Sequence, residues 1–158
     1  MKVQDVMTKK TVFCSPETNL AEAAVRMWKN DCGFLPVVGE GGNVIGVVTD
    51  RDISIALGTR NQRPAELRVW DLMHNRLFTC TAEEDVHCAL KTLRAQKVRR
   101  LPVIDREGGL VGVLSIDDIV LKARGHASGK DVSYKDVEDT YKAIQRRPAC
   151  KKDGCAAA

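Results

Sequence analysis

The sequence repeats itself with an offset of 66 residues. The Leu-Pro-Val of residues 35–37 recurs at 101–103, and Asp52 recurs as Asp118, with no gap in the alignment between these positions. A repeat of this length indicates two copies of one supersecondary unit. A unit of about 55 residues leaves one sheet face uncovered and would be marginally stable alone. We therefore expect the two copies to pack together about a pseudo-two-fold axis, with two equivalent clefts where they meet.

Both copies have the same predicted order of elements, βαββα, which makes the fold class α+β. A short β-prone segment, Thr11–Cys14 in one copy and Leu77–Thr81 in the other, precedes a helix whose apolar residues recur at i, i+3, i+4 and i+7. Two β-branched strands joined by a Gly-rich turn follow, and a second helix closes each copy. Pro36 and Pro102 cannot donate to a β-ladder, so their strands are expected to lie or begin at a sheet edge.

The same pattern gives the predicted domain boundaries and the core. The first unit spans residues 1–62, the second 67–126, and a C-terminal helix with a disordered tail occupies 127–158. The helical residues expected to face the core are Leu20, Ala23, Ala24, Met27, Ile53, Ala56, Leu57, Val86, Ala89, Leu90, Leu93, Ile119, Val120 and Ala123.

After the last strand of each copy, the sequence reads Gly, two apolar residues, Ser or Thr, two further residues and Asp. The hydroxyl and acid are Thr49 and Asp52 in the first copy, and Ser115 and Asp118 in the second. A hydroxyl residue with an acid three positions later is typical of a capping box at a helix start. A carboxylate can also accept hydrogen bonds from the vicinal diol of a ribose. One residue can do both, so the two interpretations do not exclude each other.

The copies differ just before the Leu-Pro-Val strand. The first copy has Gly33 and Phe34 there, whereas the second has Arg99 and Arg100. A guanidinium at a cleft suits phosphate, because its fork bonds two oxygens at once. The alternative is a solvated basic edge strand that discourages aggregation. Arg51, beside Asp52, could serve the other cleft but is expected to be surface charge.

These paired units resemble CBS domains, named for cystathionine β-synthase, in the tandem arrangement called a Bateman module. The resemblance covers about residues 1–125 and rests on the Asp-Val-Met-Thr and Asp-Leu-Met-His starts, the Leu-Pro-Val strands and both Gly-x-x-Ser/Thr-x-x-Asp ends. It implies clefts that bind adenosine-containing ligands: AMP, ADP or ATP, and less readily S-adenosylmethionine or NAD. It also implies a disc-shaped homodimer of tandems that regulates a partner.

Carried over by position, the resemblance implies two sites. In the first site, Ser115 and Asp118 contact the ribose, and Arg100 and Arg99 contact the phosphate. Thr8, Thr11 and Val12, from the first copy's opening segment, lie near the base. The other lacks the arginine and comprises Thr49, Asp52, His74, Leu77 and Phe78. Phe34 is expected at this second site, where it stacks on a base or fills the cleft. The Asp118 site is expected to be the stronger one.

Composition narrows the possible functions. The net charge of +4 is too small and too dispersed for a nucleic-acid-binding surface. No apolar segment reaches the roughly 18–20 residues of a membrane helix, and the N-terminus lacks a signal-peptide core. Four of the six cysteines fall in predicted elements, and Cys150 and Cys155 lack partners for a metal site. The expected location is the cytoplasm, and none of the three histidines has a partner that predicts catalysis.

The predicted C-terminal helix follows a hinge at 125–130, begins at Ser133 and ends before Pro148. Its apolar residues are Tyr134, Val137, Tyr141 and Ile144. Whether this helix folds back onto its own module or contacts a second copy stays open.

The sequence therefore predicts a non-catalytic sensor of adenine nucleotides that acts through a homodimer or a partner complex. The alternative is a ligand-free interaction module that acts through its dimer surface and C-terminal helix.

Overall fold

The computed structural model of the chain describes residues 1–73, 77–125 and 131–146. Its helices and strands follow the predicted order in both units, except that the opening segment of the first unit forms no strand. In the first unit they are α1 (Leu20–Lys29), β1 (Phe34–Val38), β2 (Val44–Thr49) and α2 (Asp50–Arg60). In the second unit they are β3 (Cys80–Thr81), α3 (Val86–Gln96), β4 (Arg100–Ile104), β5 (Leu110–Ser115) and α4 (Ile116–Lys122), followed by α5 (Tyr134–Gln145). Short 3-10 turns are η1 (Val3–Asp5), η2 (Pro64–Glu66) and η3 (Val69–Asp71).

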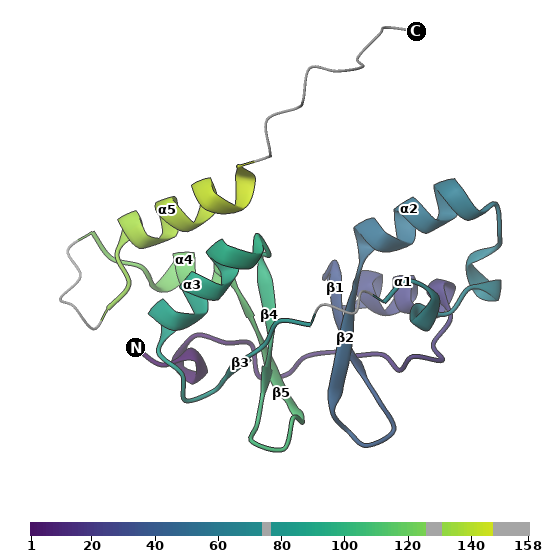
Figure 1. The fold of residues 1–158 in the computed structure, drawn as a ribbon, viewed down its shortest axis with the longest axis horizontal. Coiled ribbons are helices and arrows are strands. Elements are labelled where there is room, and N and C mark those ends of the chain that lie inside the picture. The colour runs from purple at the N-terminus through teal and green to yellow at the C-terminus, as the bar shows by residue number, and fades with distance from the viewer. Residues whose placement is uncertain (74–76, 126–130, 147–158) are drawn as a thin grey trace, which may run out of the picture.

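The two hairpins stand side by side at the centre of the molecule, and the helices flank them (Figure 1). In each unit the hairpin strands pair antiparallel in the same register, Leu35 opposite Val48 and Leu101 opposite Leu114. The hairpin tips also touch, because Asn43 and Gly109 form a bridge between the units. The α+β fold of two packed units is thus the one that the repeat predicts.

The opening strands are shorter than predicted. In the second unit only Cys80 and Thr81 form a strand, which pairs parallel with β4. In the first unit Cys14 alone makes one parallel bridge, to Val37. Pro16 follows two residues later and has no N–H with which to extend the ladder.

The proline prediction is confirmed for β1, which lies in a two-stranded sheet with β2, and is wrong for β4, which carries Pro102 and lies between β3 and β5. The isolated bridge between Cys14 and Val37 in the first unit shows how proline is accommodated next to such a neighbour. The Pro36 carbonyl accepts a 3.0 Å hydrogen bond from the Cys14 N–H, and the Val38 N–H donates to the Cys14 carbonyl at 2.8 Å. Because N–H and C=O of one strand residue point to the same side, the missing donor of Pro36 faces the sparsely paired opening segment and costs no hairpin hydrogen bond.

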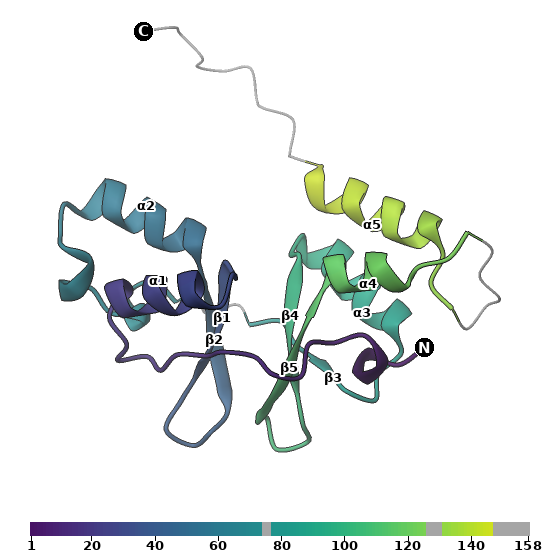
Figure 2. The ribbon, with the colours of Figure 1, turned by 180° about the vertical axis from the view of Figure 1, so that it is seen from behind.

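The two copies exchange their opening segments. Val3 and Val6 are buried in the core of the second unit, and Leu67 and Val69 are buried in the core of the first. In the reverse view the N-terminal segment crosses from the second unit past both hairpins to the first (Figure 2). The two units are therefore interlocked along the chain.

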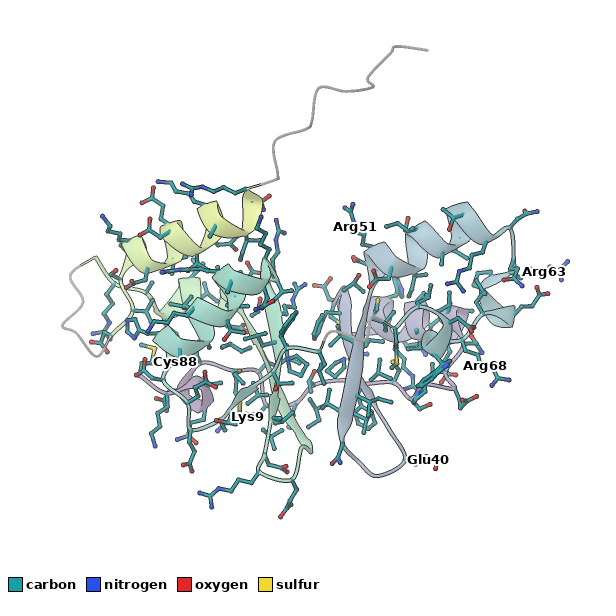
Figure 3. The ribbon with its side chains drawn as sticks, viewed as in Figure 1. Lys9, Glu40, Arg51, Arg63, Arg68 and Cys88 are labelled. Carbon is teal, nitrogen blue, oxygen red and sulfur yellow. The ribbon has the colours of Figure 1, made fainter. Side chains whose placement is uncertain are left out.

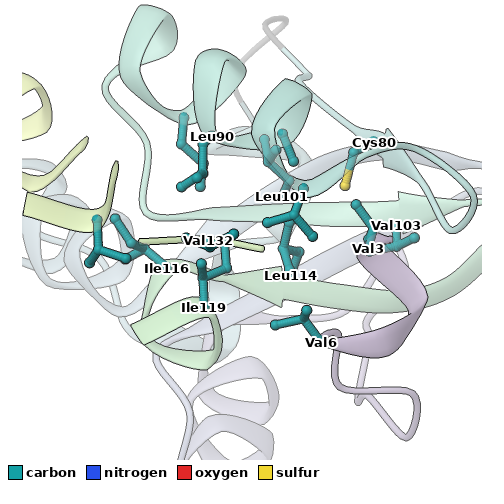
Figure 4. Packing of buried hydrophobic residues seen from close by; sticks show 14 of the residues in the cluster. Val3, Val6, Cys80, Leu90, Leu101, Val103, Leu114, Ile116, Ile119 and Val132 are labelled. Carbon is teal, nitrogen blue, oxygen red and sulfur yellow. The ribbon is translucent and has the colours of Figure 1, made fainter. Parts of the chain in front are cut away.

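Each unit has its own apolar core. The larger one lies between α3, α4 and the β4–β5 hairpin and includes Leu90, Leu101 and Leu114, all at most 1% exposed (Figure 4). Three of the residues expected to be in the core are instead exposed: Ala24, Leu57 and Val120. Ala24 is the repeat equivalent of Leu90, which is covered because the second unit carries the additional helix α5.

Helix α5 folds back onto its own module. It packs against α3 and α4, and its Val137 and Thr140 are buried. Arg94 of α3 holds it by donating to the Thr140 hydroxyl and to the Asp136 carbonyl, both at 2.6 Å. Tyr134, expected on the apolar face, is 62% exposed. The predicted hinge, apart from Gly125, and the chain beyond 146 lie outside the described residues.

Replacing Leu114 with alanine should destabilise the protein strongly. Leu114 is 0% exposed between sheet and helices, and removing such a side chain costs about 2–5 kcal/mol. Leu121→Ala is the matched control, because Leu121 is 83% exposed and should change stability by less than about 0.5 kcal/mol. Urea unfolding of both variants measures the difference. Equal losses would contradict the assignment of the core.

Candidate functional site

A cleft of about 360 Å³ opens where the first unit meets the second. The first copy's segment 8–12 and the loop after α1 form one wall, and the start of β4, the end of β5 and the start of α4 form the other. The cleft is lined by Thr8, Lys10, Thr11, Val12, Asn30, Asp31, Cys32, Phe34, Arg100, Val113, Ser115, Asp117 and Asp118. The structure thus brings together Thr8, Thr11, Val12, Arg100, Ser115 and Asp118, which the sequence assigned to one site.

Backbone pairing fixes Thr8 against β5. The Thr8 N–H donates to the Val113 carbonyl at 2.9 Å, and the Val113 N–H donates back at 3.0 Å. Gly112 permits this approach, because a Cβ there would meet the Thr8 carbonyl oxygen at 2.7 Å. The glycine of the Gly-x-x-Ser-x-x-Asp motif therefore allows residues 8–12, the opposite wall of the cleft, to pack against β5.

Ser115 and Asp118 form the predicted capping box of α4. The Ser115 N–H donates to Asp118 Oδ2 at 3.1 Å, and the Asp117 N–H donates to Ser115 Oγ at 3.2 Å. Ser115 is 7% exposed, whereas Asp118 is partly exposed at the cleft. Asp118 Oδ1 accepts no hydrogen bond from the described residues. The carboxylate thus caps the helix with Oδ2 and lines the cleft, with Oδ1 left without a donor among the described residues.

Arg100 is the guanidinium of the cleft, and Arg99 does not line it. Arg100 Nη2 lies 3.8 Å from Asp117 Oδ2, which is too long for a hydrogen bond but close enough for attraction between the charges. Arg99 is exposed, and its carbonyl accepts from the Ile116 N–H at 3.0 Å. Only one of the two arginines is therefore placed to meet a ligand in this cleft.

Phe34 lines this cleft and not the second one, so the expectation for it is corrected. It is 9% exposed and lies opposite the second unit's residues. Phe34 and Arg100 are repeat equivalents and begin β1 and β4, which both start at the junction of the units. The ring gives the cleft an apolar wall on which a flat base can stack.

The second predicted site is not assembled in the same way. A hollow of about 350 Å³ contains Asp52 but is lined otherwise by residues of α2 and of the segment 71–73. Thr49 and Asp52 form a capping box, with Thr49 N–H to Asp52 Oδ2 at 2.9 Å. Thr49, Leu77 and Phe78 do not line this hollow, and Phe78 packs against the core of the second unit.

His74 lies outside the described residues. Arg51 extends from the start of α2 into solvent (Figure 3). Among the described residues, the cleft beside Asp118 gathers more of its predicted site than the hollow beside Asp52 does.

Other kinds of site find little support in the part of the chain that the structure describes. There, no group of three His, Cys, Asp or Glu side chains could hold a metal ion. Cys150 and Cys155 lie outside that part. Within the same residues, no helix is long and apolar enough to cross a membrane.

Sequence reasoning missed several residues of the cleft. Lys10, Asn30, Asp31, Cys32 and Asp117 line it as well. Asp117 was visible as the neighbour of Asp118, and Lys10 lies between two predicted residues. Asn30 to Cys32 come from the loop that leads into β1, and the placement of Phe34 at the unit junction was the signal that could have found them.

Comparison with known proteins agrees with the fold. The protein-family model described as CBS domain matches residues 3–58 and 69–125. The CBS domain-containing protein YhcV of Bacillus subtilis is 30% identical over 126 residues, which cover 80% of this chain and 88% of that protein. An uncharacterised protein of Methanopyrus kandleri, MK0525, is 28% identical, and the match covers 76% of this chain and 61% of that one.

Two solved structures are similar and contain ligands. CBSX2 in complex with AMP is 27% identical with a TM-score of 0.66, covering 76% of this chain and 93% of that one. The CBS domain pair of protein MJ0100, in complex with 5'-methylthioadenosine and S-adenosyl-L-methionine, is 25% identical with a TM-score of 0.69, covering 77% and 98%. With both repeats matched by the family model, this chain belongs to the CBS domain family as a tandem pair.

Proposed function

We propose that this protein is a regulatory module that binds an adenine mononucleotide, AMP in particular, in the cleft beside Asp118. The observation that carries the proposal is the gathering in one cleft of an acid, a guanidinium and an apolar ring: Asp118, Arg100 and Phe34. These groups suit the three parts of a nucleotide, namely its sugar, phosphate and base. AMP in the similar protein CBSX2 supports the choice.

The ribose would meet Asp118. Its Oδ1 accepts no hydrogen bond from the described residues, and a carboxylate accepts well from the two adjacent hydroxyls of a ribose. Because the capping box fixes the position of this carboxylate, ligand binding orders no further side chain there. The phosphate would bind Arg100, and the base would lie between Phe34 and the segment of Thr11 and Val12.

The size and charge of the cleft favour a mononucleotide with one phosphate. Its volume of about 360 Å³ is near the lower end of the roughly 300–1,000 Å³ of small-molecule sites, which leaves little room for a dinucleotide such as NAD. Lys10 and Arg100 are its cations, whereas Asp31, Asp117 and Asp118 are its acids. Each phosphate added beyond the first brings more negative charge towards three carboxylates, which lowers the affinity expected for ADP and ATP.

The module acts without catalysis, by a change in the arrangement of a homodimer or of a complex with a regulated protein. A ligand can shift such an equilibrium only by its difference in affinity for the two arrangements. The cleft can supply this difference in affinity. Its walls come from both units, so the ligand binds better in the arrangement that brings the two units to the right distance.

A thermal-shift series with AMP, ADP, ATP, S-adenosylmethionine and NAD tests the proposal. A ligand at about 100 times its Kd adds roughly 2.7 kcal/mol, which should raise Tm by about 5–10 °C for a protein of this size. We expect the largest shift with AMP, and none with AMP in Asp118→Ala.

The matched control is Asp52→Ala, which removes the acid of the equivalent capping box. Both variants should lose about 0.5–2 kcal/mol of stability, but Asp52→Ala should keep the AMP shift. If neither AMP nor another adenosine ligand shifts Tm in nucleotide-free protein, the sensor proposal is wrong and a ligand-free interaction module takes its place.

Arg100→Gln should weaken AMP binding and leave adenosine binding unchanged, because adenosine has no phosphate. A charge-assisted hydrogen bond contributes about 1.5–3 kcal/mol, so the Kd for AMP should rise by about 10- to 100-fold. Arg99→Gln removes the neighbouring charge outside the cleft and should have little effect. Isothermal titration calorimetry with both ligands decides, and equal losses in the two variants would point to a general charge effect.

Bound AMP should protect Cys32 from alkylation. Cys32 lines the cleft, whereas Cys88 is exposed on α3 at the far side of the second unit (Figure 3). Burial raises the pKa of Cys14 to about 11 and that of Cys80 to about 12, so neither forms a reactive thiolate near pH 8. Iodoacetamide labelling followed by peptide mass spectrometry measures both rates. Protection of Cys88 equal to that of Cys32 would argue against a ligand in this cleft.

A further inference from the structure

Helix α5 lies outside the matched CBS domains, yet it contacts the cleft through one side chain. Tyr141 Oη donates a hydrogen bond to Asp117 Oδ1. Asp117 lines the cleft, and its Oδ2 lies 3.8 Å from Arg100 Nη2. A continuous path thus runs from α5 through one carboxylate to the guanidinium proposed for phosphate.

The contacts of Asp117 hold its carboxylate away from Arg100. Tyr141 engages Oδ1, and Ser115 Oγ donates to Oδ2 at 3.2 Å. These two hydrogen bonds fix the orientation of the carboxylate, and in that orientation its Oδ2 lies 3.8 Å from Arg100 Nη2, longer than a hydrogen bond. Arg100 therefore keeps its N–H groups available, although a carboxylate that could bind them in bidentate fashion is adjacent.

Two further observations support a lasting contact from Tyr141. Burial, together with the hydrogen bond to Asp117, raises the pKa of Tyr141, so the phenol stays protonated and can donate at neutral pH. The helix is fixed on both sides of this residue, by Arg94 at Thr140 and by Lys97 Nζ at the Arg146 carbonyl, 2.8 Å away.

We propose that Tyr141 is a positioning residue that restrains Asp117, so that docking of α5 leaves Arg100 free to bind the ligand's phosphate. This inference rests on the proposed nucleotide function and adds its regulation. If α5 leaves the module, Asp117 loses the phenol and closes onto Arg100, where it competes with phosphate. Binding of the phosphate in turn favours the docked helix, because coupling between two sites is reciprocal.

Tyr141→Phe removes only the hydroxyl and tests the proposal. The Kd for AMP should rise by about three- to tenfold, the effect of one hydrogen bond, and that for adenosine should stay the same. Tyr134→Phe is the matched control, because Tyr134 is on the same helix and its hydroxyl bonds to none of the described residues. Calorimetry with AMP and adenosine compares wild type and both variants.

A second variant separates positioning from a merely structural role. Asp117→Asn removes the competing charge, so AMP should bind at least as tightly as to wild type. In this background Tyr141→Phe should have no further effect on AMP, which a double-mutant cycle measures. Hydrogen exchange in α5 should also slow when AMP binds and stay unchanged with adenosine.

The possible outcomes are distinct. Wild-type affinity for AMP in Tyr141→Phe, or equal loss of AMP and adenosine, overturns the role of Tyr141 and leaves the proposed function intact. Weaker AMP binding in Asp117→Asn overturns the restraint as well, because it would make Asp117 a support for Arg100. If wild type binds neither ligand, both the proposed function and this inference fail.

Discussion

The exchange of opening segments between the two copies is the constraint on which the rest of the structure depends. Thr8 pairs with Val113 only because Gly112 has no side chain, and a Cβ on the equivalent Gly46 would likewise meet the Met73 side chain at 3.0 Å. Val3 and Val6 thereby enter the core of the other copy, as do Leu67 and Val69. The cleft wall formed by residues 8–12 is therefore set by core packing, and neither unit can move away without exposing apolar side chains.

The repeat places the same backbone twice, but small differences make the clefts unequal. Gly33 lets Asp50 pack closely in the first copy, since a Cβ there would lie 2.5 Å from Asp50 Oδ2 and displace that side chain. In the second copy the position of Asp50 is taken by Ile116, which is buried, and the position of Gly33 can carry Arg99. The next residues, Phe34 and Arg100, reach the same cleft. An apolar group and a cation from equivalent positions thus serve one asymmetric site, which suits a ligand with a flat apolar end and a charged end.

The sequence predicted the fold, the order of elements and six residues of one cleft, because these follow from the repeat and from local periodicity. Its errors arose where an element outside the repeat pattern, such as α5 or the short strand β3, determines whether a residue is buried or a strand is paired. Ala24 is exposed although its equivalent Leu90 is buried, since only α3 is covered by α5. Pro102 is tolerated in a central strand because β3 is only two residues long and pairs with Val103 and Ile104. Phe34 was assigned to the wrong cleft because the periodicity of one copy gives no information about which wall it faces across the pseudo-axis. Local pattern fixes which face of an element is apolar but not what covers it.

The residues that cap the start of α4 are also those proposed to bind the ligand, which has a mechanical consequence. Asp118 caps with Oδ2, while Asp117, one residue earlier, faces Arg100 and Tyr141. The first turn of α4 therefore touches the cleft on one side and α5 on the other. A short helix capped at this turn moves as a unit, because its backbone hydrogen bonds and its cap are formed together. Any displacement of that turn on ligand binding would be transmitted to α5 through Tyr141. Helix α5, which the first unit lacks, is therefore the element most directly coupled to occupancy of the cleft.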